Sequence, residues 1–281
     1  MAGGNFGGGT GTQADPFIIE DWADLEACAA DNSQKYYKVV NDLDANDRND
    51  GVWQQIQFKL FSEIDYDGHK IRNIYTDGTE SLFHFTQAAS SSQTMTVKNL
   101  EIENLYAPNA TLISGTYGIN HESCKIKGMC LFLCAPSYNL NRSAFLRCSI
   151  ALNGAGFSSS GSHYFGMKQC SVKLTDGRNF FSNCHYDQCR IVGNIKQTSV
   201  STTRINISNS KNSVFVLKDD TGGSITGASF SGTDAALPNL VVTSLLGDYT
   251  PTATNGILAT TAQANDIAWL QEHGFPVVSA V

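Results

Sequence analysis

Charged residues and prolines are scarce in this sequence, and its basic residues nowhere form a cluster. Only 16% of the 281 residues are charged, six are proline, and the formal net charge is −7. Because phosphate neutralisation requires clustered lysine or arginine side chains, neither nucleic acid nor an anionic membrane surface is expected as a partner. No apolar run reaches the roughly 20 residues that span a bilayer, so no transmembrane helix is predicted.

The usual signatures of catalysis are also missing. The glycines of GGGTGT, residues 7–12, have no lysine after them and no strand before them, so they do not predict a phosphate-binding loop. Neither a G-x-S-x-G nor an H-E-x-x-H pattern occurs. The first residues lack the basic and apolar regions of a secretory signal, so synthesis and folding in a cytoplasm are expected. The sequence therefore predicts no enzyme, no metal and no cofactor.

A short repeat runs through the middle of the chain. Four segments share a cysteine, one further residue and then Ile or Val, in HESCKIKG, FLRCSIAL, MKQCSVKL and YDQCRIVG. Their cysteines are Cys124, Cys148, Cys170 and Cys189, which lie 24, 22 and 19 residues apart. Before and after these segments Leu or Ile replaces the cysteine, at Ile64, Leu100, Ile205 and Ile225.

The repeat has the period of a β-strand, because two apolar residues flank one polar residue. A step near 20 residues is too short for a strand–helix–strand unit of roughly 30 residues. It does fit one coil of a β-solenoid. Second apolar clusters, such as Phe83 with Phe85, predict a second strand in each coil. The predicted fold is therefore all-β, a right-handed parallel β-helix with short capping helices.

In stacked coils the four cysteines of the repeat should form an internal ladder of small apolar side chains. Two alternatives stay open. A metal site could combine Cys124, Cys130 and Cys134 with His121, although their spacing is not a standard zinc pattern. Disulfides could join neighbouring coils, since parallel strands lie about 4.8 Å apart, although parallel side chains fit the S–S torsion poorly.

Both ends of the chain predict caps for the edges of a solenoid. Residues 17–31 predict a short strand and an amphipathic helix that begins at Asp21. The segment TTAQANDIAWLQEHGFPVV predicts a closing helix with Ile267 and Leu270 facing inward and Gly274 after its end. The expected organisation is a flexible Gly-rich arm at 1–12, an N-terminal cap at 13–60, coils at 61–231, and C-terminal strands, loops and a helix at 232–281.

Three motifs in the first quarter of the chain resemble a family of bacterial and phage β-helix proteins. They are FGGGTGTQADPFIIEDWADLEAC, YYKVVNDLDAND and IDYDGHKIRNIY, which lie within residues 6–75. The family shows a G-G-T-x-x-D-P-F/Y-x-I opening, a YYK-x-x-N-D-I-D strand and a turn with D-G before I-x-N-L. The resemblance implies a scaffold or adhesion role and brings no catalytic motif with it.

One group of carboxylates could carry chemistry, namely Asp65, Asp67, Glu101 and Glu103. If Ile64 stacks on Leu100, then Asp65 lies beside Glu101, and Asp67 beside Glu103 in the same register. Lys125 and Lys127 would follow on the next coil. Carboxylates one strand spacing apart match the roughly 5 Å separation of a retaining glycosidase, and they could equally bind Ca²⁺. The favoured interpretation is an exposed face of alternating charge.

The repeat and the resemblance together predict a structural part of a phage virion, either a capsid-decorating protein, a head fibre or a tail protein. The expected partners are other virion proteins, a host-surface glycan and further copies of the chain in a trimer. Two alternatives stay open. A polysaccharide depolymerase of the β-helix tailspike type would need a groove lined with aromatic and carboxylate side chains, and a bacterial cell-surface adhesin would need an export signal.

Overall fold

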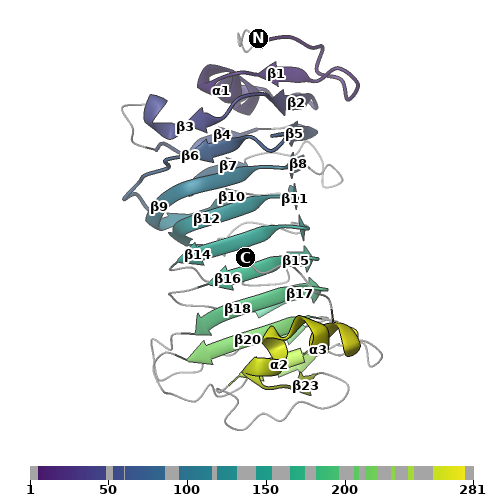
Figure 1. Cartoon of the computed structure of the whole chain (residues 1–281). Coiled ribbons are helices and arrows are strands. Elements are labelled where there is room, and N and C mark those ends of the chain that lie inside the picture. Colours follow the sequence, from purple (N-terminus) through teal and green to yellow (C-terminus); the bar gives the residue numbers. More distant parts are fainter. Residues whose placement is uncertain are drawn as a thin grey trace. The chain divides into compact units, whose positions relative to one another are not determined.

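The computed structural model forms two compact units, Met1–Ala144 and Phe145–Val281, called here the N-terminal and C-terminal units. The structure describes residues 6–48, 53–59, 61–85, 95–115, 119–131, 144–153, 165–174, 182–195, 206–208, 213–219, 229–231, 240–243 and 256–275. Within each unit the strands are parallel and wind into the coils of a β-solenoid, which confirms the predicted parallel β-helix (Figure 1).

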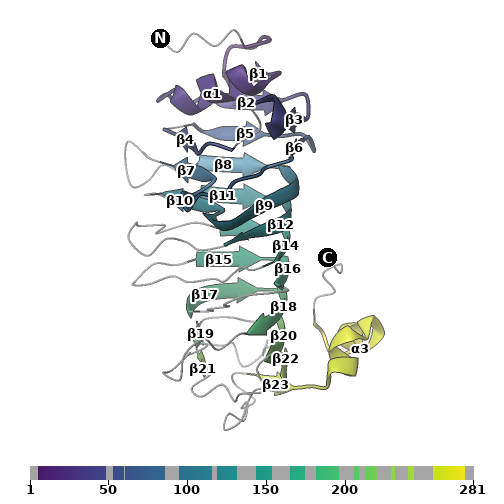
Figure 2. The same cartoon turned by 90° about the vertical axis from the view of Figure 1, so that its left-hand side faces the viewer.

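The N-terminal unit contains three parallel sheets (Figure 2). The first sheet is β1 (Phe17–Ile19), β2 (Tyr36–Val39), β5 (Glu63–Asp65), β8 (Met95–Lys98) and β11 (Ile119–Glu122). The second sheet is β3 (Leu43–Asp44), β6 (Lys70–Arg72), β9 (Glu101–Thr111) and β12 (Lys125–Leu131). The third sheet is β4 (Ile56–Phe58), β7 (Phe83–Phe85) and β10 (Ile113–Gly115).

The C-terminal unit contains two sheets of parallel strands. One contains β13 (Ala144–Leu146), β15 (Phe165–Lys168), β17 (Ser182–Asp187), β19 (Asn206–Ser208) and β21 (Ser229–Ser231). The other contains β14 (Ser149–Asn153), β16 (Ser171–Leu174), β18 (Arg190–Ile195), β20 (Val214–Asp219), β22 (Leu240–Thr243) and β23 (Ile257–Leu258).

A residue in the left-handed conformation turns the chain from one sheet into the next. In the N-terminal unit φ is 54° at Asn99 and 56° at Ser123, and the residues that follow, Leu100 and Cys124, are buried. In the C-terminal unit the same corner occurs at Arg147, Gln169 and Gln188. This conformation costs about 1–2 kcal/mol for a residue other than glycine. The corner turns the next side chain inward, which explains why the sequence repeats Leu or Cys there.

Three of the repeat cysteines, Cys148, Cys170 and Cys189, are buried on successive coils of the C-terminal unit. The Cys170 thiol donates to the carbonyl oxygen of Phe145 at 3.2 Å, and the Cys189 thiol donates to that of Met167 at 3.3 Å. Burial raises the pKa of the Cys189 thiol well above its usual value. These cysteines therefore pack as small side chains of the core.

Cys124 is buried in the N-terminal unit, where its thiol lies 3.5 Å from the carbonyl oxygen of Glu122. All four repeat cysteines are free thiols in the structure. Within the described ranges no group of three His, Cys, Asp or Glu residues could hold a metal ion. The side chain of Cys130 and the whole of Cys134, which the metal alternative needs, lie outside the described residues.

Helix α1 (Trp22–Ala30) closes the first coil as the sequence predicted. The Asp21 side chain accepts from the Asp24 N–H at 3.1 Å, while Leu25 and Cys28 are buried. Arg48 contacts both this helix and the segment that precedes β4. Its guanidinium carbon lies 5.6 Å and 5.3 Å from the ring centroids of Trp22 and Trp53, a double cation–π contact.

Residues 6–12 pack against β1, so the expectation of a flexible arm over 1–12 is wrong for this stretch. The Gly7 N–H donates to the Ile18 carbonyl oxygen, and the Ile18 N–H donates to the Gly8 carbonyl oxygen, both at 3.0 Å. At Gly9, with φ of 85°, a Cβ atom would lie 1.9 Å from the Pro16 carbonyl oxygen. The glycines permit close backbone packing over the edge strand and do not indicate a linker.

The closing helix is split in two, α2 (Thr261–Asn265) and α3 (Ile267–Glu272), because Asp266 begins a new helix. Its carboxylate accepts from the Trp269 N–H at 3.1 Å. Leu270 is buried as predicted, whereas Ile267 is 58% exposed, so its predicted inward position is wrong. The break reorients α3 relative to the single helix that the sequence suggested.

The two short helices cover an apolar part of the sheet in the C-terminal unit (Figure 1). Ala264, Leu270 and Phe275 pack on Val214 and Val216 of β20. Both faces of β20 are thereby buried at Val214, Phe215 and Val216, which explains the continuous apolar run VFV. Gly274, with φ of 73°, ends α3 as expected.

Replacing Cys170 with alanine should lower the free energy of unfolding by about 1–2 kcal/mol, because a buried sulfur leaves the packed core. Lys173→Ala, at an exposed position of the same coil, is the matched control and should change it by less than about 0.5 kcal/mol. Denaturant unfolding measures both variants. Equal stability of Cys170→Ala and the wild type would contradict the core role.

Candidate functional site

The predicted carboxylates lie at the corner between the first and second sheets of the N-terminal unit and on the outer face of the second sheet. Asp65 pairs with Lys98 across β5 and β8, so its predicted position beside Glu101 is wrong. Ile64 stacks on Val97 in the first sheet, whereas Leu100 follows the corner residue. The repeat pattern equates Ile64 with Leu100, but these residues lie at different places in the coil. The inter-coil register predicted from the sequence therefore differs from the register in the structure.

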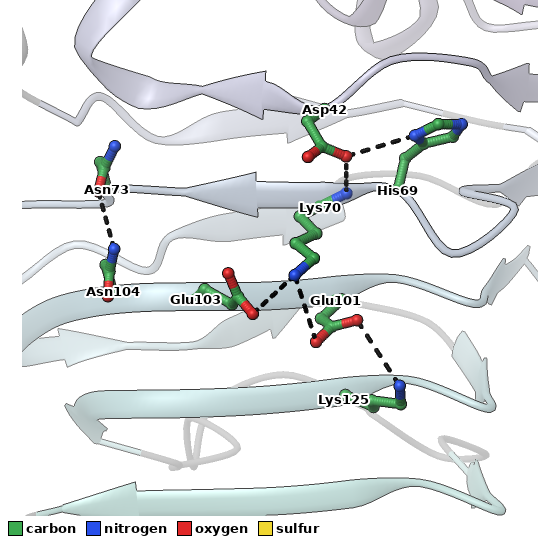
Figure 3. Close-up of polar contacts among 8 residues, drawn as sticks. All are labelled: Asp42, His69, Lys70, Asn73, Glu101, Glu103, Asn104 and Lys125. Atoms are coloured by element: carbon green, nitrogen blue, oxygen red, sulfur yellow. Dashed lines mark hydrogen bonds and ion pairs between the residues drawn. The ribbon is translucent and has the colours of Figure 1, made fainter.

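Glu101 lies between two lysines on the outer face of the second sheet (Figure 3). Lys70 Nζ lies 3.9 Å from Glu101 Oε1 and 2.8 Å from Glu103 Oε1. Lys125 Nζ lies 3.7 Å from Glu101 Oε2. The hydrogen bond from Lys70 lowers the pKa of the Glu103 carboxyl and raises that of the lysine. The result is an exposed face on which cations and carboxylates alternate from coil to coil.

Lys70 is the residue of this face that sequence reasoning missed. The motif GHKIRN places Ile71 as the inward residue, which makes Lys70 and Arg72 outward neighbours of the glutamates. Lys127 does not take the predicted place beside Glu103, because the register shifts between Ile126 and Gly128.

The two aspartates also have partners. Lys38 Nζ lies 2.9 Å from Asp67 Oδ2, and this hydrogen bond lowers the pKa of Asp67. Asp65 Oδ1 accepts from the Asn99 side chain at 2.8 Å and from the Asp67 N–H at 2.8 Å. A glycosidase acid needs a raised carboxyl pKa, whereas Asp67 and Glu103 are shifted downward.

A polar hollow of about 360 Å³ opens at this corner of the N-terminal unit. Its lining consists of Asp67, Gly68, Asn99, Leu100, Glu101, Ser123 and Lys125. The size suits a small ligand. Its charged groups are nevertheless balanced by cations of the same unit, since Asp67 pairs with Lys38 and Glu101 pairs with Lys125. The hollow can offer hydrogen bonds, and each of its two carboxylates lies within ion-pair distance of a lysine.

A second corner on the same sheet carries an amide ladder and two tyrosines. Asn73 and Asn104 are both left-handed, with φ of 60° and 52°, and the Asn104 amide donates to Asn73 Oδ1 at 3.1 Å (Figure 3). Beyond this corner the rings of Tyr75 and Tyr106 stack at 5.5 Å with 7° between their planes. The matching segments IRNIY and IENLY are a sequence signal that could have identified this pair.

His121, considered above as a metal ligand, is buried in the core of the N-terminal unit. It stacks in register on Val97, and burial lowers the pKa of its imidazole to about 3. The residue lines a small apolar cavity together with Tyr66 and Phe85. A neutral imidazole is therefore part of the core, and protonation of this side chain opposes folding.

Comparisons with known proteins do not identify a family for this chain. No family model matches the sequence, and no curated protein matches it either. One solved structure is similar at 14% identity with a TM-score of 0.41, covering 92% of this chain and 86% of the other. It is described as a "putative immunoglobulin A1 protease" from Bacteroides ovatus. Of the helices in the described residues, none is both long and apolar enough to cross a membrane.

Replacing Glu101 with glutamine should change the free energy of unfolding by less than about 1 kcal/mol, because solvent screens exposed ion pairs. Any stabilisation from the ion pairs of Glu101 with Lys70 and Lys125 should decrease as the salt concentration rises. Lys70→Met, which removes the shared cation, is the companion variant. Denaturant unfolding at low and high salt measures both, and a loss of several kcal/mol in Glu101→Gln would refute the surface assignment.

Stability should fall as the pH decreases below about 6.5, because the unfolded state then binds a proton that buried His121 does not. The folded pKa near 3 is below the unfolded value, so the loss grows from about pH 6.5 down to about pH 3. At pH 5 it should reach about 2 kcal/mol relative to pH 7. His121→Val should remove this part of the pH dependence, and an unchanged slope in the variant would contradict the assignment.

Proposed function

We propose that this chain is a non-enzymatic structural component of a phage virion, a capsid-decorating, head-fibre or tail protein that faces the host. The observation that carries the proposal is that all four candidate carboxylates have ion-pair or hydrogen-bond partners. Asp67, Glu101 and Glu103 are each paired with a lysine, and Asp65 accepts hydrogen bonds from an amide and a backbone N–H. The only polar residues singled out for catalysis thus serve to balance charge on a solenoid surface.

The fold supports a scaffold role. Inward side chains fill the core of each coil, while outward side chains can vary without disturbing it. Residues 6–12 and α1 cover the first edge strand, which limits uncontrolled strand pairing at that end. The motifs within residues 6–75 resemble phage and bacterial β-helix proteins, and this resemblance favours a particle component. The proposed partners are other virion proteins, copies of the same chain in a trimer, and a host-surface glycan.

The first alternative, a polysaccharide depolymerase, would use the polar hollow that Glu101 lines. It would require one carboxyl to stay protonated beside an ionised one. The hydrogen bond from Lys70 favours the ionised form of Glu103, and Glu101 lies between Lys70 and Lys125. The second alternative, a bacterial cell-surface adhesin, is compatible with the same scaffold, and the location of the protein separates it from a virion component.

Antibody raised against the purified chain should label phage particles of the encoding strain at one position in immunogold electron microscopy. The chain should also co-sediment with intact particles. Purified wild-type protein should leave the viscosity of host capsule and cell-wall polysaccharide unchanged. Labelling of the bacterial surface without particles would support the adhesin. A fall in viscosity that Glu101→Gln abolishes would support the depolymerase.

A further inference from the structure

We propose that the stacked pair Tyr75 and Tyr106 forms a platform that binds an uncharged glycan. The proposal rests on the host-facing role proposed above and names the surface that would carry it. The two residues are directly paired across adjacent coils, in a parallel bridge beyond the corner at Asn73 and Asn104.

The platform is preorganised by the backbone. The Tyr106 N–H donates to the Ile74 carbonyl oxygen at 2.8 Å, and the Thr76 N–H donates to the Tyr106 carbonyl oxygen at 3.0 Å. Ile74 and Leu105, the residues before the tyrosines, are buried and anchor each ring to the core. Because the backbone and neighbouring residues already hold the rings, the two tyrosine side chains would lose little conformational entropy when a ligand binds.

Both rings face solvent to an unusual degree for large side chains. Tyr75 is 47% exposed and Tyr106 is 44% exposed. The other strongly exposed large apolar side chains of the described residues, Ile257, Leu258 and Ile267, belong to the C-terminal unit. The tyrosine pair is therefore a small aromatic surface within an otherwise polar face of the N-terminal unit.

Polar groups surround the rings. The Tyr75 hydroxyl donates to Asp77 Oδ2 at 2.9 Å, and this bond raises the pKa of the phenol. The Asn109 amide donates to the Asp77 carbonyl oxygen at 3.5 Å. Within the described residues, Asp77 Oδ1 and the Tyr106 hydroxyl have no hydrogen-bond partner and remain available for a ligand.

This combination fits a pyranose better than a protein surface. A sugar ring presents C–H groups on one face, which can lie on an aromatic ring, and hydroxyl groups around its edge, which can bond to carboxylate and amide groups. A stable protein interface buries about 800 Å² on each partner around an apolar core, far more than two side chains supply. The acidic Asp77 and the net charge of −7 disfavour an anionic chain and favour a neutral one.

The test uses the purified full-length chain and a set of neutral oligosaccharides, namely maltohexaose, cellohexaose, laminarihexaose and chitohexaose. We expect at least one of them to bind, and the variant with both Tyr75→Ala and Tyr106→Ala to bind about tenfold more weakly or not at all. Asp77→Asn, at an exposed position, should weaken binding without altering the core. Tyr36→Ala, at a half-buried tyrosine of β2, is the matched control and should bind like the wild type.

Titration followed by NMR of the aromatic resonances measures these affinities, and circular dichroism confirms that each variant folds. The platform is overturned if none of the four sugars binds the wild type, or if the double variant and Asp77→Asn bind as the wild type does. A change in molar mass by light scattering in the double variant would assign the pair to a protein interface instead. Particle labelling does not depend on sugar binding, so the two proposals can fail separately.

Discussion

The coils of both units depend on a recurring corner between two sheets, at which one residue is held in the left-handed conformation. It occurs in the described residues at Asn99, Ser123, Arg147, Gln169 and Gln188. The backbone N–H groups of Asn99, Gln169 and Arg147 donate across to the next coil at 2.9 Å, to the carbonyl oxygens of Glu122, Asp187 and Lys168, respectively. These inter-coil bonds and the burial of the following Leu or Cys offset a local conformational cost of about 1–2 kcal/mol. Because the same corner recurs, the strands that follow it stack in register within each unit.

The corner also determines which side chains face solvent and can form polar contacts. It turns the residue after it inward and the next residue outward, so Leu100 enters the core while Glu101 faces solvent beside Lys70 and Lys125. Parallel, in-register stacking then brings residues of neighbouring coils within ion-pair distance. The charged face of the N-terminal unit is thus a direct consequence of coil geometry. Balanced charges of this kind stabilise a surface modestly and do not create a reactive carboxyl.

Additional segments cover the first edge strand of the solenoid and one outer face of its C-terminal unit. At the first edge, residues 6–8 pair with the strand β1, and α1 packs beneath through Leu25 and Cys28. In the C-terminal unit α2 and α3 instead cover the outer face of β20. Both devices remove apolar or unpaired backbone surface from water, which a stack of identical coils cannot do by itself.

The sequence by itself determined the fold class, the positions of the repeat cysteines in the core and the start of α1 at Asp21. These features depend on local periodicity and capping, which act over a few residues. It could not determine the inter-coil register, because Ile64 and Leu100 look alike in the repeat although they lie on different strands. The Lys70 contacts and the Tyr75–Tyr106 stack likewise join residues more than 30 positions apart. Only the stacking of complete coils decided those pairings, because their register depends on the length and corners of every intervening segment.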